Sequence, residues 1–131
     1  AWRGGNGTFR EYLVESDSEL FLWFERSVTA AWGLFGGDTG SKPLVIVERP
    51  GQDRLELLKV NGVKMPKGTV IRSRTGGGGG YGEARRRDPA AVRDDVIDGY
   101  VTTGHARAVY GVAFDDALNV DQAATARLRS A

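Results

Sequence analysis

The sequence predicts an α+β fold, in which an N-terminal antiparallel β platform is followed by a C-terminal tail of short helices. Three observations support this prediction. Residues 1–75 contain short segments rich in β-branched and aromatic residues, separated by turn residues. A run of five glycines follows, and helix-capping residues then precede segments with helical spacing. We expect a single domain with a β-rich part at 1–75, a Gly-rich crossover at 76–87 and a helical tail at 88–131.

The first strands are expected near the N-terminus. Residues 8–15 (TFREYLVE) and 19–26 (ELFLWFER) flank the polar break at 16–18, a pattern typical of a β-hairpin. The apolar segment 43–48 (PLVIVE) indicates a buried strand.

Turn residues separate the remaining strands. RPGQD at 49–53 predicts a turn after the buried strand, because proline fixes φ and glycine tolerates positive φ. A strand is expected over 54–62, ending at the turn dipeptide Asn61-Gly62, and the last strand lies within 66–75 after a Pro-Lys-Gly turn.

The helices are predicted from their ends. Asp88 is a good N-cap, Pro89 suits the first helical position and Gly99 is expected to end the first helix, with Val92 and Val96 on its apolar face. A second short helix is expected from Thr102 or Thr103 to Gly111. A third begins after the N-cap Asp121, with Ala124 and Leu128 facing inward.

Composition excludes several protein classes. The net charge is +1, and only the Ala-Arg-Arg-Arg segment at 84–87 is locally basic, so we expect no nucleic-acid partner. No apolar run approaches the roughly 20 residues of a membrane span, and we expect no membrane partner. The chain has no cysteine, which excludes disulfides and thiolate metal sites and fits a cytoplasmic protein.

Glycine is the outlier, at 19 of 131 residues, roughly twice ordinary usage. Gly77, Gly79 and Gly82 formally match a dinucleotide-binding fingerprint, but the strand–turn–helix context is missing because the helix begins only at Pro89. Two interpretations remain: a tight crossover anchored by Tyr81, or a segment that lines a ligand site.

The segment 30–40 (AAWGLFGGDTG) places large apolar side chains among glycines. Such a loop can present backbone N–H groups to an anion or a carbonyl oxygen. Equally, its aromatic side chains can be buried against a neighbouring subunit. The candidate ligand-facing residues are Trp32, Gly33, Gly36, Gly37, Gly78 and Tyr81.

The chain offers no recognisable catalytic set. His105 is its only histidine, and it is expected to face solvent or to be satisfied locally, so no metal site is predicted. Asp94 and Asp95 are interpreted as a solvated helix face, and no Ser-His-Asp spacing is defensible.

Four segments together resemble the C-terminal part of the hydantoinase B/oxoprolinase family. They are WRGGNGTFREY at 2–12, WGLFGGDTG at 32–40, the glycine run with its following helices at 77–112, and NVDQAATARLRSA at 119–131. The resemblance covers essentially the whole chain and extends to multi-subunit, ATP-dependent ketone carboxylases of the acetone and acetophenone type.

The resemblance implies a non-autonomous enzyme subunit. Family members are several hundred residues long, so the chain is expected to be either a fragment or a separately encoded small subunit that completes a truncated hydantoinase B-like large subunit. Hydantoinase A-like partners would bind ATP with a divalent metal, and this chain alone would bind no cofactor. Ketone carboxylation is the leading expectation, hydantoin or 5-oxoproline hydrolysis an alternative, and a purely structural cap another.

Surplus aromatic residues point to an obligate hetero-oligomer. A strand that is covered on one side buries only about half of its side chains in its own core. The surplus is expected at a large subunit interface. Its predicted residues are Trp2, Phe21, Trp23, Phe24, Trp32 and Phe35.

Overall fold

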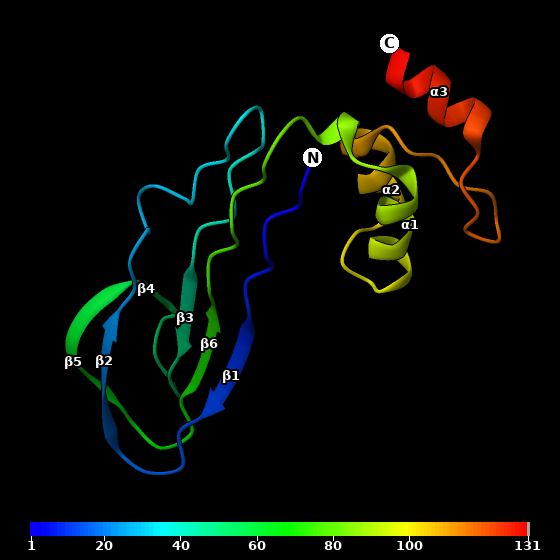
Figure 1. The fold of residues 1–131 in the computed structure, drawn as a ribbon. Coiled ribbons are helices and arrows are strands. Elements are labelled where there is room, and N and C mark those ends of the chain that lie inside the picture. Colours follow the sequence, from blue (N-terminus) through cyan, green and yellow to red (C-terminus); the bar gives the residue numbers. More distant parts are fainter. Residues whose placement is uncertain (131) are drawn as a thin grey trace. The chain divides into compact units, whose positions relative to one another are not determined.

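The computed structural model describes residues 1–130, and the fold combines antiparallel sheets with short helices (Figure 1). The α+β prediction is confirmed. The strands are β1 (Phe9–Leu13), β2 (Ser18–Trp23), β3 (Leu44–Glu48), β4 (Leu55–Leu57), β5 (Lys59–Met65) and β6 (Val70–Arg74). A 3₁₀ turn η1 (Ala84–Arg86), helix α1 (Pro89–Ile97), helix α2 (Thr103–His105), a π-helical turn η2 (Ala106–Tyr110) and helix α3 (Gln122–Ser130) follow.

The chain forms two compact units, each assembled from separate segments. The β unit contains Gly5–Trp32 and Thr39–Gly79, and therefore all six strands. The helical unit contains Ala1–Gly4, Gly33–Asp38 and the chain from Gly80 onward. The predicted single-domain organisation stays a prediction.

The β unit is built from two antiparallel sheets. One has the strand order β1-β6-β3-β4, and the other pairs β2 with β5. Val45, Val47 and Met65 are almost completely buried between them. Partly buried side chains from both sheets pack around these three residues, as in other sheet-on-sheet cores.

The predicted hairpin of the first two strands is wrong. β1 pairs with β6, with Phe9 opposite Arg74, whereas β2 pairs with β5, with Ser18 opposite Met65. The polar break at 16–18 therefore connects two different sheets. Local sequence does not reveal this, because both pairings join residues that are far apart along the chain.

The predicted turn at Asn61-Gly62 is also wrong, since both residues lie inside β5. Leu20 pairs with Val63 and Leu22 with Val60, so two residues of β5 stand opposite one residue of β2. Gly62 has φ +68°, which makes this a β-bulge with glycine in the left-handed conformation. A glycine with positive φ serves a bulge here in place of the predicted turn.

The other two turns are confirmed. After β3, the Gln52 N–H donates to the Arg49 carbonyl at 3.2 Å, and Gly51 has φ +67°. Before β6, the Thr69 N–H donates to the Pro66 carbonyl at 3.1 Å.

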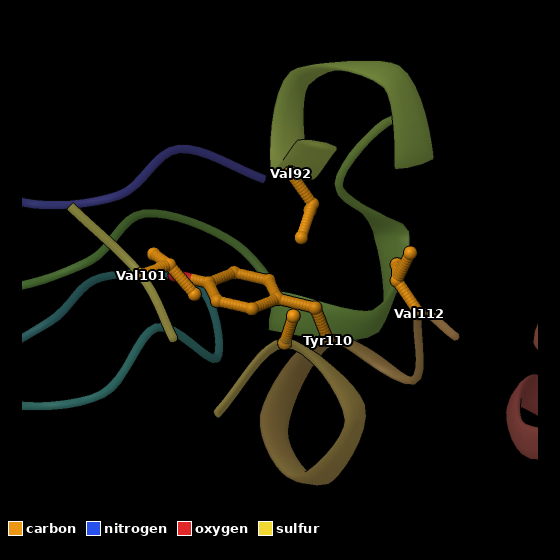
Figure 2. Packing of buried hydrophobic residues seen from close by; sticks show 5 residues of the cluster. Val92, Val101, Tyr110 and Val112 are labelled. Atoms are coloured by element: carbon orange, nitrogen blue, oxygen red, sulfur yellow. The ribbon is translucent and has the colours of Figure 1, made fainter. Parts of the chain in front are cut away.

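The helical unit has its own apolar core. Val92, Val101, Ala106, Tyr110 and Val112 are buried together. Figure 2 shows the side chains of Val92 and Val101 pointing toward the ring of Tyr110. Helical spacing on α1 had predicted Val92 on the apolar face.

The helix ends follow the sequence signals. The Asp88 carboxylate accepts from the Ala90 N–H at 2.9 Å, and Gly99 takes φ +77° directly after the helix. Thr102 caps α2 through the His105 N–H at 3.1 Å, and Gly111 takes φ +63° after η2.

Asp121 caps α3 through the Ala124 N–H at 2.9 Å. Ala124 and Leu128 are half-buried on this helix, and Thr125, which was not predicted to face inward, is buried. Its hydroxyl oxygen accepts from the Ala113 N–H at 3.0 Å.

Candidate functional site

A glycine–aromatic cluster in the helical unit contains four of the predicted ligand-facing residues. Gly33, Gly36 and Gly37 lie in the segment Gly33–Asp38, which runs beside Tyr81. The Leu34 N–H donates to the Gly80 carbonyl at 2.9 Å, and the Gly82 N–H donates to the Leu34 carbonyl at 2.8 Å. The predicted loop and the end of the glycine run therefore form one backbone-paired structure.

Glycine is required here by close backbone approach. A Cβ on Gly33 would lie 2.0 Å from the Gly37 carbonyl oxygen, and a Cβ on Gly37 would lie 2.2 Å from the Gly80 carbonyl oxygen. Both distances are far below van der Waals contact. At Gly36 the requirement is conformational, because φ is +87°.

Several N–H groups of this cluster already have backbone partners. Gly37 donates to Leu34 at 3.0 Å, Gly80 to Asp38 at 2.9 Å and Tyr81 to the Trp2 carbonyl at 2.9 Å. An anion held by these donors would have to replace existing hydrogen bonds. A ligand-facing role for these residues stays a prediction.

Aromatic side chains of the cluster are exposed. The rings of Phe35 and Tyr81 have centroids 5.1 Å apart, and Phe35 is 76% exposed. Trp2, whose backbone forms two hydrogen bonds with that of Tyr81, is 73% exposed. These residues give the helical unit an apolar surface.

The other two predicted ligand-facing residues, Trp32 and Gly78, lie in the β unit. Gly76, Gly77 and Gly78 line a hollow of about 590 Å³. Its other lining residues are Trp23, Phe24, Glu25, Arg26, Ala31, Ser41, Pro43 and Thr75. The predicted set is thus divided between the two units.

One cation stands out in this hollow. The Arg26 guanidinium lies 4.6 Å from the centroid of the Trp32 ring, a cation–π distance. Within residues 1–130 no acidic side chain forms an ion pair with Arg26, whereas its neighbour Glu25 pairs with Lys59 at 3.1 Å. Arg26 lines the hollow and Trp32 does not, so the hollow can offer a guanidinium to an anionic group.

The predicted interface residues are mostly exposed. Five of the six, Trp2, Phe21, Trp23, Trp32 and Phe35, are at least 60% exposed. Phe24 differs, because it packs against the core of the β unit. Whether these residues form an interface stays a prediction.

Asp95 was missed by sequence reasoning. Asp94 is exposed, as predicted, whereas Asp95 is only 8% exposed, so the interpretation as a solvated helix face is wrong for Asp95. Its carboxylate pairs with Arg87 at 2.7 Å and with Arg3 at 3.4 Å. The helical spacing contained the signal, since Asp95 follows the buried Val92 by three positions.

The basic segment is used within the helical unit. Arg85 donates to the Leu128 carbonyl at 2.9 Å, and Arg86 pairs with Glu83 at 2.9 Å. Arg129 donates to the Arg87 carbonyl at 2.7 Å, and partial burial lowers the pKa of Arg129 from its ordinary value. The local charge run thus fixes helices to one another.

His105 is exposed and meets the ring of Tyr110 edge-on, with centroids 5.8 Å apart. Among residues 1–130 there is no group of three or more His, Cys, Asp or Glu side chains placed to hold a metal ion. Over the same residues, no helix is both long enough and apolar enough to cross a bilayer.

Fold and site together define an α+β module in which glycine-rich backbone segments pack on one another beneath exposed aromatic side chains. The sequence profile of the family described as "Hydantoinase B/oxoprolinase" matches residues 1–84. The chain belongs to the hydantoinase B/oxoprolinase family.

Three relatives illustrate the relationship. The chain is 30% identical over 130 residues to the B-type subunit of a putative D-/L-hydantoinase from Pseudomonas sp. (strain NS671), covering 98% of this chain and 22% of that protein. Over 58 residues it is 43% identical to the acetone carboxylase alpha subunit of Xanthobacter autotrophicus, covering 41% of this chain and 8% of that one. The crystal structure of ATP-dependent caprolactamase from Pseudomonas jessenii superimposes with a TM-score of 0.73 at 28% identity, covering 97% of this chain and 23% of that chain.

The chain thus spans less than a quarter of the length of the relatives that it matches over almost its whole length.

Proposed function

We propose that this chain completes a hydantoinase B-like protein within a multi-subunit, ATP-dependent enzyme, and that it has no catalytic activity alone. One observation carries the proposal: the chain superimposes over 97% of its length on 23% of an ATP-dependent caprolactamase. A segment that forms a quarter of a larger enzyme chain serves that enzyme as a part.

The specific assignment that we favour is the small, gamma-type subunit of acetophenone carboxylase. The family resemblance and the similarity to an acetone carboxylase alpha subunit support it. In this assignment hydantoinase A-like subunits bind ATP and a divalent metal, and the hydantoinase B-like part hosts carbon–carbon bond formation in the cytoplasm.

Physical chemistry suggests what this chain contributes. An activated carboxylate or an enol phosphate hydrolyses readily, so it must react where water is excluded. The exposed aromatic side chains and the interlocked glycine backbone are suited to closing such a site. In the hollow of the β unit, Arg26 held on the Trp32 ring is the group best placed to attract an anion.

A second candidate is an amidohydrolase of the hydantoinase or 5-oxoprolinase type. It is favoured by the similarity to the D-/L-hydantoinase and to the caprolactamase, both of which match this chain along almost its whole length. A purely structural cap is the third, favoured by the backbone partners of the glycine N–H groups.

Identification of the partners tests the proposal. A tag on this chain is expected to retrieve, from its native host, a hydantoinase B-like polypeptide and hydantoinase A-like polypeptides, recognised by mass spectrometry. The purified assembly is then assayed for ATP hydrolysis with acetophenone and bicarbonate, and separately with hydantoin, 5-oxoproline and caprolactam. A monomeric chain without partners, or one that turns over substrate alone, would refute the proposal.

The variant Arg26→Met distinguishes a site component from a cap. In the purified assembly, an increased KM with intact subunit composition indicates that the hollow contacts the substrate. Unchanged kcat and KM would favour the alternative in which the chain is a purely structural cap. Arg54→Met, which removes an exposed arginine elsewhere in the β unit, is the matched control.

A further inference from the structure

The four-stranded sheet has an outer face that no other element of the β unit covers. Strand register places Phe9, Leu13, Leu44, Ile46 and Val70 on the side opposite the buried Val45 and Val47, because paired residues of antiparallel strands point to the same side. Phe9 and Leu13 are 65% and 64% exposed. We call this surface the outer sheet face.

The composition of β3 indicates that this face is normally covered. β3 reads Leu-Val-Ile-Val-Glu, an apolar run without the alternation typical of a strand with one wet side. Strands that are buried on both faces have such continuous apolar runs. In the β unit, only the face bearing Val45 and Val47 meets the second sheet.

The charged groups at the centre of the outer sheet face are paired with one another. Arg72 forms ion pairs with Glu11 on one neighbouring strand and with Glu48 on the other. The hydrogen bonds that Arg72 donates to Glu48 and Glu11 raise the pKa of its guanidinium, and the bond to Glu48 has the larger effect. Arg72 and the two glutamates together carry a net charge of −1, and Arg74, which pairs with Phe9 and so lies on the same face, balances that charge. A partner that covers this face therefore does not need to supply compensating charges, and its own surface should be apolar and close to neutral.

We infer that the outer sheet face is the surface on which the hydantoinase B-like large polypeptide packs. This inference rests on the proposed function. The length of the caprolactamase chain indicates which polypeptide covers this face. More than three quarters of that chain lies outside the part that matches this fold, and the equivalent of that remainder here would be the large polypeptide. The face is also distinct from the aromatic residues that the sequence singled out for an interface.

Photo-crosslinking identifies the occupant. The assembly is purified with p-benzoylphenylalanine in place of Phe9, irradiated, and analysed by mass spectrometry. The expected adduct joins this chain to the hydantoinase B-like polypeptide. An adduct between two copies of this chain, or no protein adduct although the hydantoinase B-like polypeptide co-purifies, overturns the inference and leaves the proposed function standing. Absence of a hydantoinase B-like polypeptide from the assembly refutes the proposed function itself.

The Arg72 cluster tests burial independently of the crosslink. Arg72→Met leaves two carboxylates without their cation, which costs little in water but weakens association on the order of a hundredfold when the cluster is buried at an interface. The triple variant Arg72→Met/Glu11→Gln/Glu48→Gln removes those carboxylate charges and is expected to restore association.

The control is Arg86→Met, which removes one partner of the exposed pair with Glu83. Association is measured as the concentration at which the large polypeptide dissociates during size-exclusion chromatography. Unchanged association of Arg72→Met, or a loss that the triple variant does not reverse, contradicts burial of this face.

Discussion

The two units place their arginine–carboxylate clusters in opposite environments. In the helical unit, the side chains of Arg87 and Asp95 are both only 11% exposed. In the β unit, Arg72 and its two glutamates are between 35% and 51% exposed. Since water weakens ion pairs and burial strengthens them, the same chemistry contributes differently in the two units. The cluster of the helical unit stabilises that unit itself, whereas the cluster of the β unit is the one that we infer to be covered on assembly.

The largest expected effect is at Asp95. Asp95→Asn leaves the buried Arg87 without its counter-charge, and such a loss costs about 3 kcal/mol of unfolding free energy. Denaturant unfolding of the purified assembly measures it. Asp94→Asn, at the neighbouring position of the same helix, is the control and should change stability by less than about 0.5 kcal/mol. If the two substitutions lowered the unfolding free energy equally, the buried ion pair would contribute no special stability to the helical unit.

The second largest loss of stability is expected where backbone segments contact one another in the glycine–aromatic cluster. Gly37→Ala places a methyl group 2.2 Å from the Gly80 carbonyl oxygen and should destabilise the helical unit by about 1–3 kcal/mol. Gly5→Ala is the matched substitution in the β unit, where an added Cβ has no atom within 4 Å. Thermal melts of both variants compare the two. A Gly37→Ala variant as stable as Gly5→Ala would mean that the close contact relaxes without cost.

A smaller effect is expected at the first turn of α1. Asp88→Ala removes the side-chain cap and should cost about 1 kcal/mol. Asp98→Ala, at the other end of the same helix, should be neutral or slightly stabilising because a negative charge is unfavourable at a helix C-terminus. Circular dichroism during denaturation measures both changes. The cap is unimportant if the two variants melt alike.

The smallest effect concerns Asp115, whose carboxylate accepts hydrogen bonds from the Ala117 and Asn119 N–H groups. These hydrogen bonds hold the pKa of Asp115 below its ordinary value of 3.8, and the bonds from Asn119 have the largest effect. The folded-state pKa is the lower one, so the stabilisation is present above pH 3.8 and is lost as pH falls through the folded pKa.

Melting of wild type and Asp115→Ala at about pH 6 and about pH 3 tests this linkage. The difference between the two proteins should shrink at the lower pH. A constant difference would assign the stabilisation to contacts that do not depend on charge.

The helical unit was more predictable from sequence than the β unit, for a physical reason. Asp88, Thr102 and Asp121 cap their helices through N–H groups two or three residues away, so the signal is local. Strand pairing depends on partners far along the chain, and the hairpin prediction for β1 and β2 was therefore wrong. Asn61-Gly62 shows the same limit, because this dipeptide is typical of turns but the pairing with the opposing strand makes it a bulge.

The candidate site was only partly predictable. Sequence identified the glycine-rich segments, and the structure pairs Leu34 with Gly80 and Tyr81 with Trp2. Which glycines require a missing Cβ depends on these non-local contacts and is not visible in a run of identical residues. The burial of Asp95 was not predicted, because two adjacent acidic residues are typical of a solvated helix face, whereas Asp95 lies three residues after Val92 and therefore on the buried side of α1.

The interleaving of the units has a consequence for synthesis on the ribosome. The helical unit contains both residues 1–4 and the residues from Gly80 onward, so residues 1–4 find their partners only after Gly80 and the residues that follow it have been synthesised. A truncation before Gly80 leaves the β unit's residues complete, whereas removal of the first four residues damages only the helical unit. Nascent chains stalled at successive lengths should therefore acquire protease resistance first in the strands of the β unit and later in residues 1–4.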